Sequence, residues 1–176
     1  MLEIKKGYDV ADNNLLACPR YHIEAVLNML EDQPQPAKFT GGLEARRIEK
    51  WFIDRLITMR LKTAFTAYDN ESQRNHIERA VKMILDQSGW SSGIARNKLQ
   101  CYVLVGFDGD TIQSAVDRLE FIKELGIRPF PMFYQPPLET RVQPSSIWKS
   151  IMRQYLRPNI IYSLPEQRLD QETMEI

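Results

Sequence analysis

The chain repeats one pattern five times: a short apolar strand, a turn with polar residues, and then an amphipathic helix. This order is typical of consecutive βα units. The predicted strands are Tyr8–Ala11, Lys38–Thr40, Thr63–Ala67, Leu99–Val105 and Pro129–Tyr134. Because parallel βα units bring the carboxyl ends of their strands to one face, we expect the ligand-binding groups to gather there.

The helices between the strands are predicted from apolar residues that recur at helical spacing. These apolar stripes are core packing, and they run over 23–30, 48–59, 77–85 and 112–122. We expect Ser88-Gly89 to end the third helix and Asp110 or Thr111 to cap the fourth. The continuous apolar run Tyr102–Val105 predicts a strand that is buried on both faces.

The expected fold is therefore α/β, with five parallel strands and outer helices in an open sheet or a partial barrel. Five strands are too few for a closed eight-stranded barrel. We divide the chain into a βα domain over residues 1–136 and a C-terminal region over residues 137–176. That region contains one more helix, marked by the apolar positions between Ile147 and Tyr155, and a polar tail from Glu166 to Ile176.

Composition excludes several classes of partner. The 176 residues are 43% hydrophobic and carry a formal net charge of zero, without a dense Lys/Arg run. This balance indicates one domain with a real core and gives no support to nucleic-acid or membrane binding driven by overall charge, which leaves a local charged patch as the alternative. No apolar run is long enough to span a membrane and no signal peptide is present, so we expect a cytoplasmic protein. Cys18 and Cys101 are expected to be reduced thiols, with Cys101 a small core residue.

Polar or glycine residues follow each of the five strands. Gly41-Gly42 allows backbone amides to approach a ligand, although a tight strand-to-helix turn explains the pair equally well. Neither a phosphate-binding loop nor a dinucleotide fingerprint follows it, which disfavours phosphate-driven nucleotide binding. Arg46 is suited to pairing with a ligand carboxylate, or it is a solvated helix residue.

Carboxylate and amide side chains at Asp12, Asn13 and Asp69 suit the hydroxyl or ammonium groups of a polar ligand. Helix capping by Asn14 or Asp69 is the alternative interpretation. His22 and His76 lie among polar neighbours at helix starts, and we interpret both as surface residues.

Taken in order, six segments resemble the later strands of a radical S-adenosylmethionine (SAM) core domain. They are 12–16, 39–46, 65–69, 102–107, 117–126 and 129–135. The resemblance covers about Gly7 to Pro136 and is to uncharacterised radical SAM proteins of bacteria and phages. It implies a (βα)₆ partial barrel without its first βα unit, with SAM lying across the strand ends.

The resemblance also implies roles for individual residues. Those near the methionyl amino group are Asp12 and Asn13; those near the methionyl and ribose parts are Gly41, Gly42 and Arg46. Asp69 is implied near the ribose hydroxyls, Val105 and Gly106 beside the adenine, and Tyr134 and Gln135 at the last strand.

One feature of the family is missing. Its first strand ends in a loop whose three cysteines hold a 4Fe–4S cluster, and this chain has only Cys18 and Cys101, in different units. We therefore expect an N-terminally truncated radical SAM protein that binds no metal cluster and is inactive alone. A partner chain or a preceding segment is expected to cover the edge of Tyr8–Ala11.

Two alternatives remain open. The first is a non-catalytic βα module that binds SAM or a similar small molecule, or a subunit of a split enzyme. The second is a hydrolase or an aldolase on a barrel scaffold, for which the sequence offers no convincing base and nucleophile pair and no lysine at a strand end.

Overall fold

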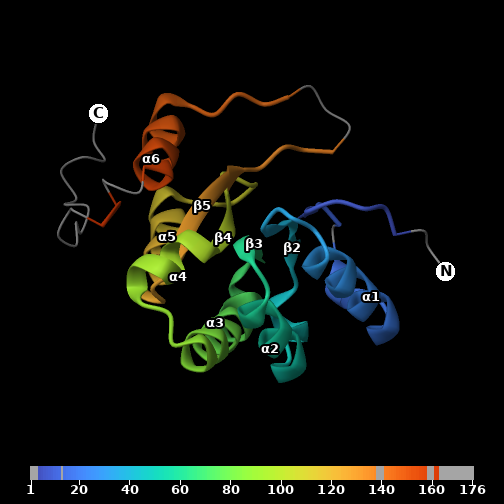
Figure 1. The fold of residues 1–176 in the computed structure, drawn as a ribbon. Helices are drawn as coiled ribbons and strands as arrows, with labels where there is room; N and C mark the ends of the chain where they lie inside the picture. Colours follow the sequence, from blue (N-terminus) through green and yellow to red (C-terminus); the bar gives the residue numbers. More distant parts are fainter. Residues whose placement is uncertain (1–3, 13, 138–140, 158–160, 163–176) are drawn as a thin grey trace.

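The computed structural model of the chain describes residues 4–12, 14–137, 141–157 and 161–162. Five strands form one parallel sheet, in which each strand pairs with the next one along the chain (Figure 1). The strands are β1 (Asp9–Val10), β2 (Ala37–Leu43), β3 (Leu61–Tyr68), β4 (Leu99–Val105) and β5 (Arg128–Phe133). The predicted α/β fold with five parallel strands is confirmed.

Six α-helices accompany the sheet in the part of the chain that the structure describes. They are α1 (Arg20–Glu31), α2 (Lys50–Thr58), α3 (Arg74–Ser88), α4 (Ser92–Lys98), α5 (Ile112–Glu124) and α6 (Ser146–Leu156). The four helices predicted between strands are present. The sequence did not predict α4, because Ala95 is its only buried residue and it has no apolar stripe. Within the part of the chain that the structure describes, no helix is long and apolar enough to cross a membrane.

Capping residues define the ends of two helices. Gly89 ends α3 in the left-handed conformation, at a φ of 61°. Thr111 caps α5, and its hydroxyl accepts a hydrogen bond from the backbone N–H of Ser114. Of the two caps that the sequence offered for α5, Thr111 is the correct one.

Burial alternates along β4, so the expectation that this strand is buried on both faces is wrong. Leu99, Cys101, Val103 and Val105 belong to the core, whereas the intervening residues are only half-buried. With consecutive strands adjacent, right-handed crossovers place their helices on one face of the sheet, which explains the alternation.

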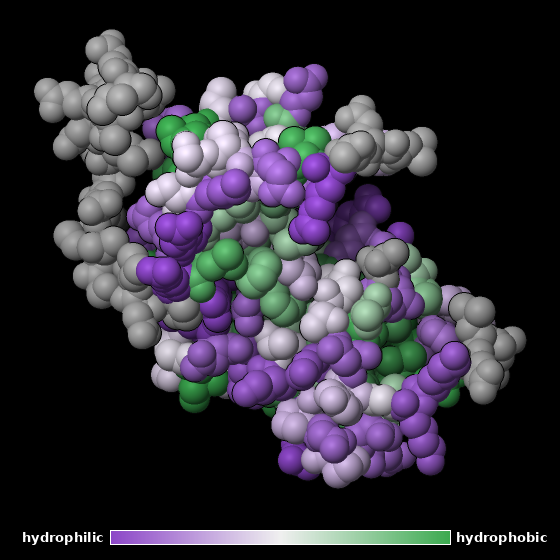
Figure 2. Space-filling model, turned by 90° about the horizontal axis from the view of Figure 1, so that it is seen from above, coloured by the Kyte–Doolittle hydropathy of each residue, from purple (hydrophilic) through white to green (hydrophobic). Residues whose placement is uncertain are grey.

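Aromatic side chains gather on the other face of the sheet. The rings of Phe65 and Tyr102 stack at 4.3 Å, and Phe130 meets both edge-on, at 5.9 and 5.6 Å. Seen from above in Figure 2, the middle of the molecule presents apolar and neutral residues, and hydrophilic residues surround them. Phe65 is buried and Tyr102 and Phe130 are half-buried, so these rings cover part of this face of the sheet.

The double glycine lies inside β2 and not after it, which corrects the predicted strand end at Thr40. The pairing register between β2 and β3 shifts between Phe39 and Leu43, and Gly42 has a φ of 90°. A positive φ is open to glycine at little cost, so the backbone passes through this irregularity and the strand continues to Leu43.

The C-terminal helix α6 packs against β5 and α5. The Tyr155 hydroxyl donates to Glu120 Oε1 at 2.6 Å, and Arg128 Nη2 donates to the carbonyl of Leu156 at 3.0 Å. The helix predicted between Ile147 and Tyr155 is thus confirmed. The tail from Glu166 to Ile176 lies outside the described residues.

Candidate functional site

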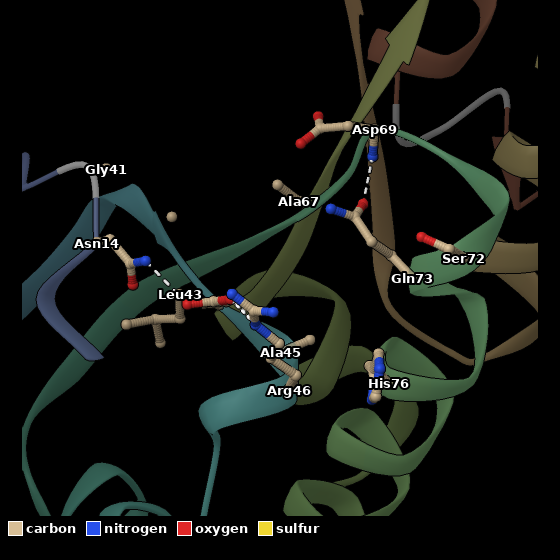
Figure 3. Close-up of a pocket in the computed structure, with 12 residues that line it drawn as sticks. Asn14, Gly41, Leu43, Ala45, Arg46, Ala67, Asp69, Ser72, Gln73 and His76 are labelled. Atoms are coloured by element: carbon tan, nitrogen blue, oxygen red, sulfur yellow. Dashed lines mark hydrogen bonds and ion pairs between the residues drawn. The ribbon is translucent and has the colours of Figure 1, made fainter. Parts of the chain in front are cut away.

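A pocket of about 480 Å³ opens where β2 and β3 end (Figure 3). The loop after β1 contributes Asn14, the end of β2 contributes its glycines, and the helical turns after β2 and β3 supply the other polar groups. The lining residues are Asn14, Gly41, Gly42, Leu43, Glu44, Ala45, Arg46, Ala67, Asp69, Ser72, Gln73 and His76. We refer to this cavity as the main pocket.

Glu44 holds three other side chains at one side of the main pocket. Asn14 Nδ2 donates to Glu44 Oε2 at 2.8 Å, Arg47 Nε donates to the same oxygen at 2.7 Å, and Arg46 Nε donates to Oε1. Burial alone would raise the pKa of Glu44, but the hydrogen bonds from Asn14, Arg46 and Arg47 outweigh it and lower the pKa. Glu44 is therefore a carboxylate at neutral pH, suited to positioning these groups.

Arg79 of α3 fixes the backbone of the same side. Its Nη2 atom donates to the carbonyls of Ala45, Arg46 and Ile48, at 3.3, 3.1 and 3.5 Å. These residues form or follow the short 3₁₀ helix η2 (Ala45–Arg47). A charged donor shared among three carbonyls holds the turn in place.

Asp69 stands on the opposite side of the main pocket. Its backbone N–H donates to Gln73 Oε1 at 2.6 Å, while its carboxylate makes no hydrogen bond to any described residue. Figure 3 shows that carboxylate directed away from Gln73, over the pocket. The turn that follows is capped by Asn70, whose Oδ1 accepts from the Ser72 N–H at 3.1 Å, so Asp69 remains available for a ligand.

The Asn14 side chain likewise makes no helix-capping hydrogen bond. It occupies the N-cap position of the 3₁₀ helix η1 (Leu15–Ala17), but its amide reaches Glu44 instead. Helix capping was the alternative interpretation for Asn14 and Asp69, and neither side chain forms a cap.

His76 is a pocket residue that the sequence interpretation missed. Its side chain is exposed, as expected, but it lines the main pocket together with Ser72 and Gln73. The available signal was the spacing 72, 73 and 76, which places the three residues on one helical face directly after a strand end. His22, by contrast, is half-buried on α1 and does not line the pocket.

Four of the residues chosen from the sequence meet at the main pocket: Gly41, Gly42, Arg46 and Asp69. Asp12 is exposed outside it, and its Oδ1 accepts the backbone N–H of Asn14 at 2.8 Å. Asn13 lies outside the described residues.

The other four chosen residues lie at the ends of the last two strands or just after them, and they do not line the main pocket. Val105 is buried and accepts the backbone N–H of Tyr134 at 2.9 Å. The Gly106 N–H donates to Asp110 Oδ2 at 2.8 Å, and the Gln135 amide bonds to the backbone of Val142. They are therefore positioned at the ends of β4 and β5.

A buried ion pair supports the end of β4. Arg118 Nη2 donates to Asp110 Oδ2 at 2.8 Å and to the Leu104 carbonyl at 2.9 Å, and both side chains are buried. Because Asp110 also accepts from Gly106, the pair ties α5 to the loop after β4. Because the Asp110 carboxylate is engaged by Arg118 and Gly106, Thr111 and not Asp110 caps α5.

The cysteines do not fit an iron–sulfur cluster. Cys101 is fully buried in the core; burial and, to a lesser extent, the charge of Asp69 raise its thiol pKa well above the ordinary value. Cys18 is half-buried on another unit. Among the residues that the structure describes, no group of three or more His, Cys, Asp or Glu side chains is arranged to hold a metal ion. A cluster needs cysteine thiolates gathered at one place.

No protein-family model, curated protein or solved structure matches the chain.

Proposed function

We propose that this chain is a ligand-binding domain of the radical SAM type, a (βα)₆ partial barrel without its first βα unit, that binds SAM in the main pocket. The main observation behind the proposal is that candidate residues from different βα units meet at one cavity. Gly41, Gly42, Arg46 and Asp69, which the resemblance assigns to SAM, surround one cavity although they come from different βα units.

The size and the chemistry of the main pocket support this ligand. Its volume of about 480 Å³ lies within the roughly 300–1,000 Å³ typical of small-molecule sites. The Asp69 carboxylate is suited to accepting hydrogen bonds from ribose hydroxyls, and Arg46 is suited to the methionyl carboxylate. Both groups face the cavity from opposite sides.

The proposed function of the chain itself is binding, because its thiols do not gather into a cluster site. In the family that it resembles, a 4Fe–4S cluster supplies the electron that cleaves SAM. Cysteines for such a cluster would come from a partner chain or a further segment beside β1.

Calorimetric titration of the chain with SAM tests the proposal. Asp69→Asn removes the charge that would face the ribose, and we expect SAM affinity to fall roughly tenfold, as for one hydrogen bond to a charged group. Asp108→Asn is the matched control, since Asp108 is exposed after β4 and does not line the main pocket. The proposal fails if the wild-type chain does not bind SAM, or if both variants bind it equally well.

A further inference from the structure

A second hollow, of about 280 Å³, lies where the first turns of α1 and α2 meet. We refer to it as the arginine hollow. It is lined by Leu16, Cys18, Arg20, Ile23, Arg46, Arg47, Glu49 and Trp51. Only Arg46 lines both this hollow and the main pocket, so the two cavities are neighbours with different walls.

Three guanidinium groups line the arginine hollow. Each one bonds a carboxylate through Nε: Arg20 bonds Glu24 at 2.8 Å, and both Arg46 and Arg47 bond Glu44. None of their terminal Nη atoms makes a hydrogen bond to a described residue. The paired N–H groups at the ends of guanidinium are the donors that fit phosphate and carboxylate oxygens.

Contacts orient the three arginine side chains, which are 64%, 61% and 46% exposed at Arg20, Arg46 and Arg47. The Arg20 guanidinium lies 4.5 Å from the centre of the Trp51 ring. Glu44 anchors the other two side chains, and Arg79 fixes the backbone of Arg46 by bonding the carbonyls around it. Preorganised donors lose less conformational entropy when they bind a ligand.

One carboxylate, Glu49, lines the arginine hollow, and Glu24 and Glu44 pair with its arginines from outside, so the formal charges balance. Glu24 and Glu44 lie outside its lining, and Glu49, which lines it, accepts the Trp51 Nε1–H at 2.9 Å. Neither α1 nor α2 has a side-chain cap or an acidic residue in its first turn. The N-terminus of α1 therefore adds the positive end of its helix dipole, whereas the N-cap position of α2 is occupied by Glu49.

We propose that the arginine hollow is a binding site for a small multivalent oxyanion that carries phosphate or carboxylate groups. This proposal does not rest on the proposal for SAM, because Arg20 and Arg47 do not line the main pocket, although Arg46 lines both cavities. It would recognise its ligand by the geometry of the unbonded, paired N–H donors.

Calorimetric titrations with pyrophosphate and with citrate, at low ionic strength, test the site and distinguish the two ligand chemistries. We expect Arg20→Ala/Arg47→Ala to weaken the better probe at least tenfold. Arg60→Ala/Arg153→Ala removes the same net charge from exposed positions elsewhere and is expected to bind like the wild type. Tighter binding of pyrophosphate assigns the ligand to phosphate compounds, and tighter binding of citrate assigns it to carboxylates.

The Trp51 Nε1–H resonance provides a second readout on the wild-type chain, which covers the case of a variant that does not fold. Trp51→Phe identifies its signal, and saturation with the probe should shift it while the indole signals of Trp90 and Trp148 stay in place. The proposal is overturned if neither probe binds, if the two double variants bind equally, or if another indole responds instead. SAM affinity should remain close to the wild-type value in the single variant Arg20→Ala, because Arg20 bonds Glu24 and touches none of the main-pocket groups, so the two proposals fail separately.

Discussion

Gly41, which lines the main pocket, has no room for a side chain. A Cβ added there would collide with the carbonyl of Asp12, with the carbonyl carbons of Asp12 and Ala11 only 2.6 and 2.7 Å away. The segment after β1 thus approaches β2 closely only because residue 41 has no side chain. This approach brings the first strand unit against the glycines that line the main pocket.

We expect Gly41→Ala to destabilise the chain by about 1–3 kcal/mol, the usual cost of overpacking a well-packed site. Gly93→Ala is the control: an added Cβ there has no atom within 4 Å, and it lies inside α4, where alanine is favoured over glycine by roughly 0.5–1 kcal/mol. Urea unfolding measures both changes. Equal stability of the two variants would contradict the close approach of the Asp12 backbone.

At the scale of secondary-structure elements, α6 is attached to α5 through a buried tyrosine. The Tyr155 hydroxyl bonds Glu120, whose other oxygen accepts from Lys123 at 2.7 Å. Burial raises the pKa of Tyr155, and the hydrogen bond and charge of Glu120 raise it further. Burial also raises the pKa of Tyr68, at the end of β3, to about 12.

Raised tyrosine pKa values predict a loss of stability in alkali. The stabilisation that the protonated tyrosines supply is complete below the unfolded-state pKa of about 10. It is lost as pH rises through the pKa values of these tyrosines in the folded state. We expect the free energy of unfolding to fall from pH 10 to 12, and Tyr155→Phe to reduce that dependence. The variant should also lose about 1.5–3 kcal/mol at pH 7, the range for hydrogen bonds to charged groups.

Tyr21→Phe is the matched control for this alkaline effect, because Tyr21 lies exposed on α1. Chemical denaturation at several pH values compares the two variants. If Tyr155→Phe and Tyr21→Phe show the same pH dependence, the attachment of α6 through Glu120 is wrong.

At the scale of the whole molecule, the two edges of the sheet differ. Alternate residues of β5 direct their N–H groups towards β4, and Tyr134, just after the strand, continues this pattern when it donates to the carbonyl of Val105. Pro129 and Pro131 occupy the intervening positions, which face the outer edge of the sheet. The prolines remove donors from the outer edge, which α6 also contacts. In the described residues, β1 has neither protection, and unprotected edges tend to pair with other strands.

We propose that the outer edge of β1 pairs with another strand, and we expect the chain alone to self-associate as its concentration rises. Lys38 N–H donates to the Tyr8 carbonyl, so the alternate residues Asp9 and Ala11 direct their backbone groups outward. Ala11→Pro removes an outward donor and should shift the chain towards the monomer, as measured by light scattering. A wild-type chain that stays monomeric at high concentration would refute this proposal.

The order of strands and helices is accessible from the sequence alone, because it depends on local patterns. Apolar residues at a period of 3.6 define the helices, and short apolar runs between polar turns define the strands. The parallel pairing follows from the helical connections. Strand ends were less predictable: β2 passes through Gly41-Gly42 because contact with the Asp12 backbone and a register shift, both tertiary effects, determine its course.

The sequence by itself determined which βα units carry polar groups at their strand ends, and Gly41, Gly42, Arg46 and Asp69 are four of the ten candidate residues that it singled out. Only the tertiary structure decided that these four share one cavity with His76, and that Arg20 and Arg47 face a second one. The reason is physical. Periodicity reports which side of its own element a residue occupies, whereas a cavity depends on register, packing and long-range hydrogen bonds between elements.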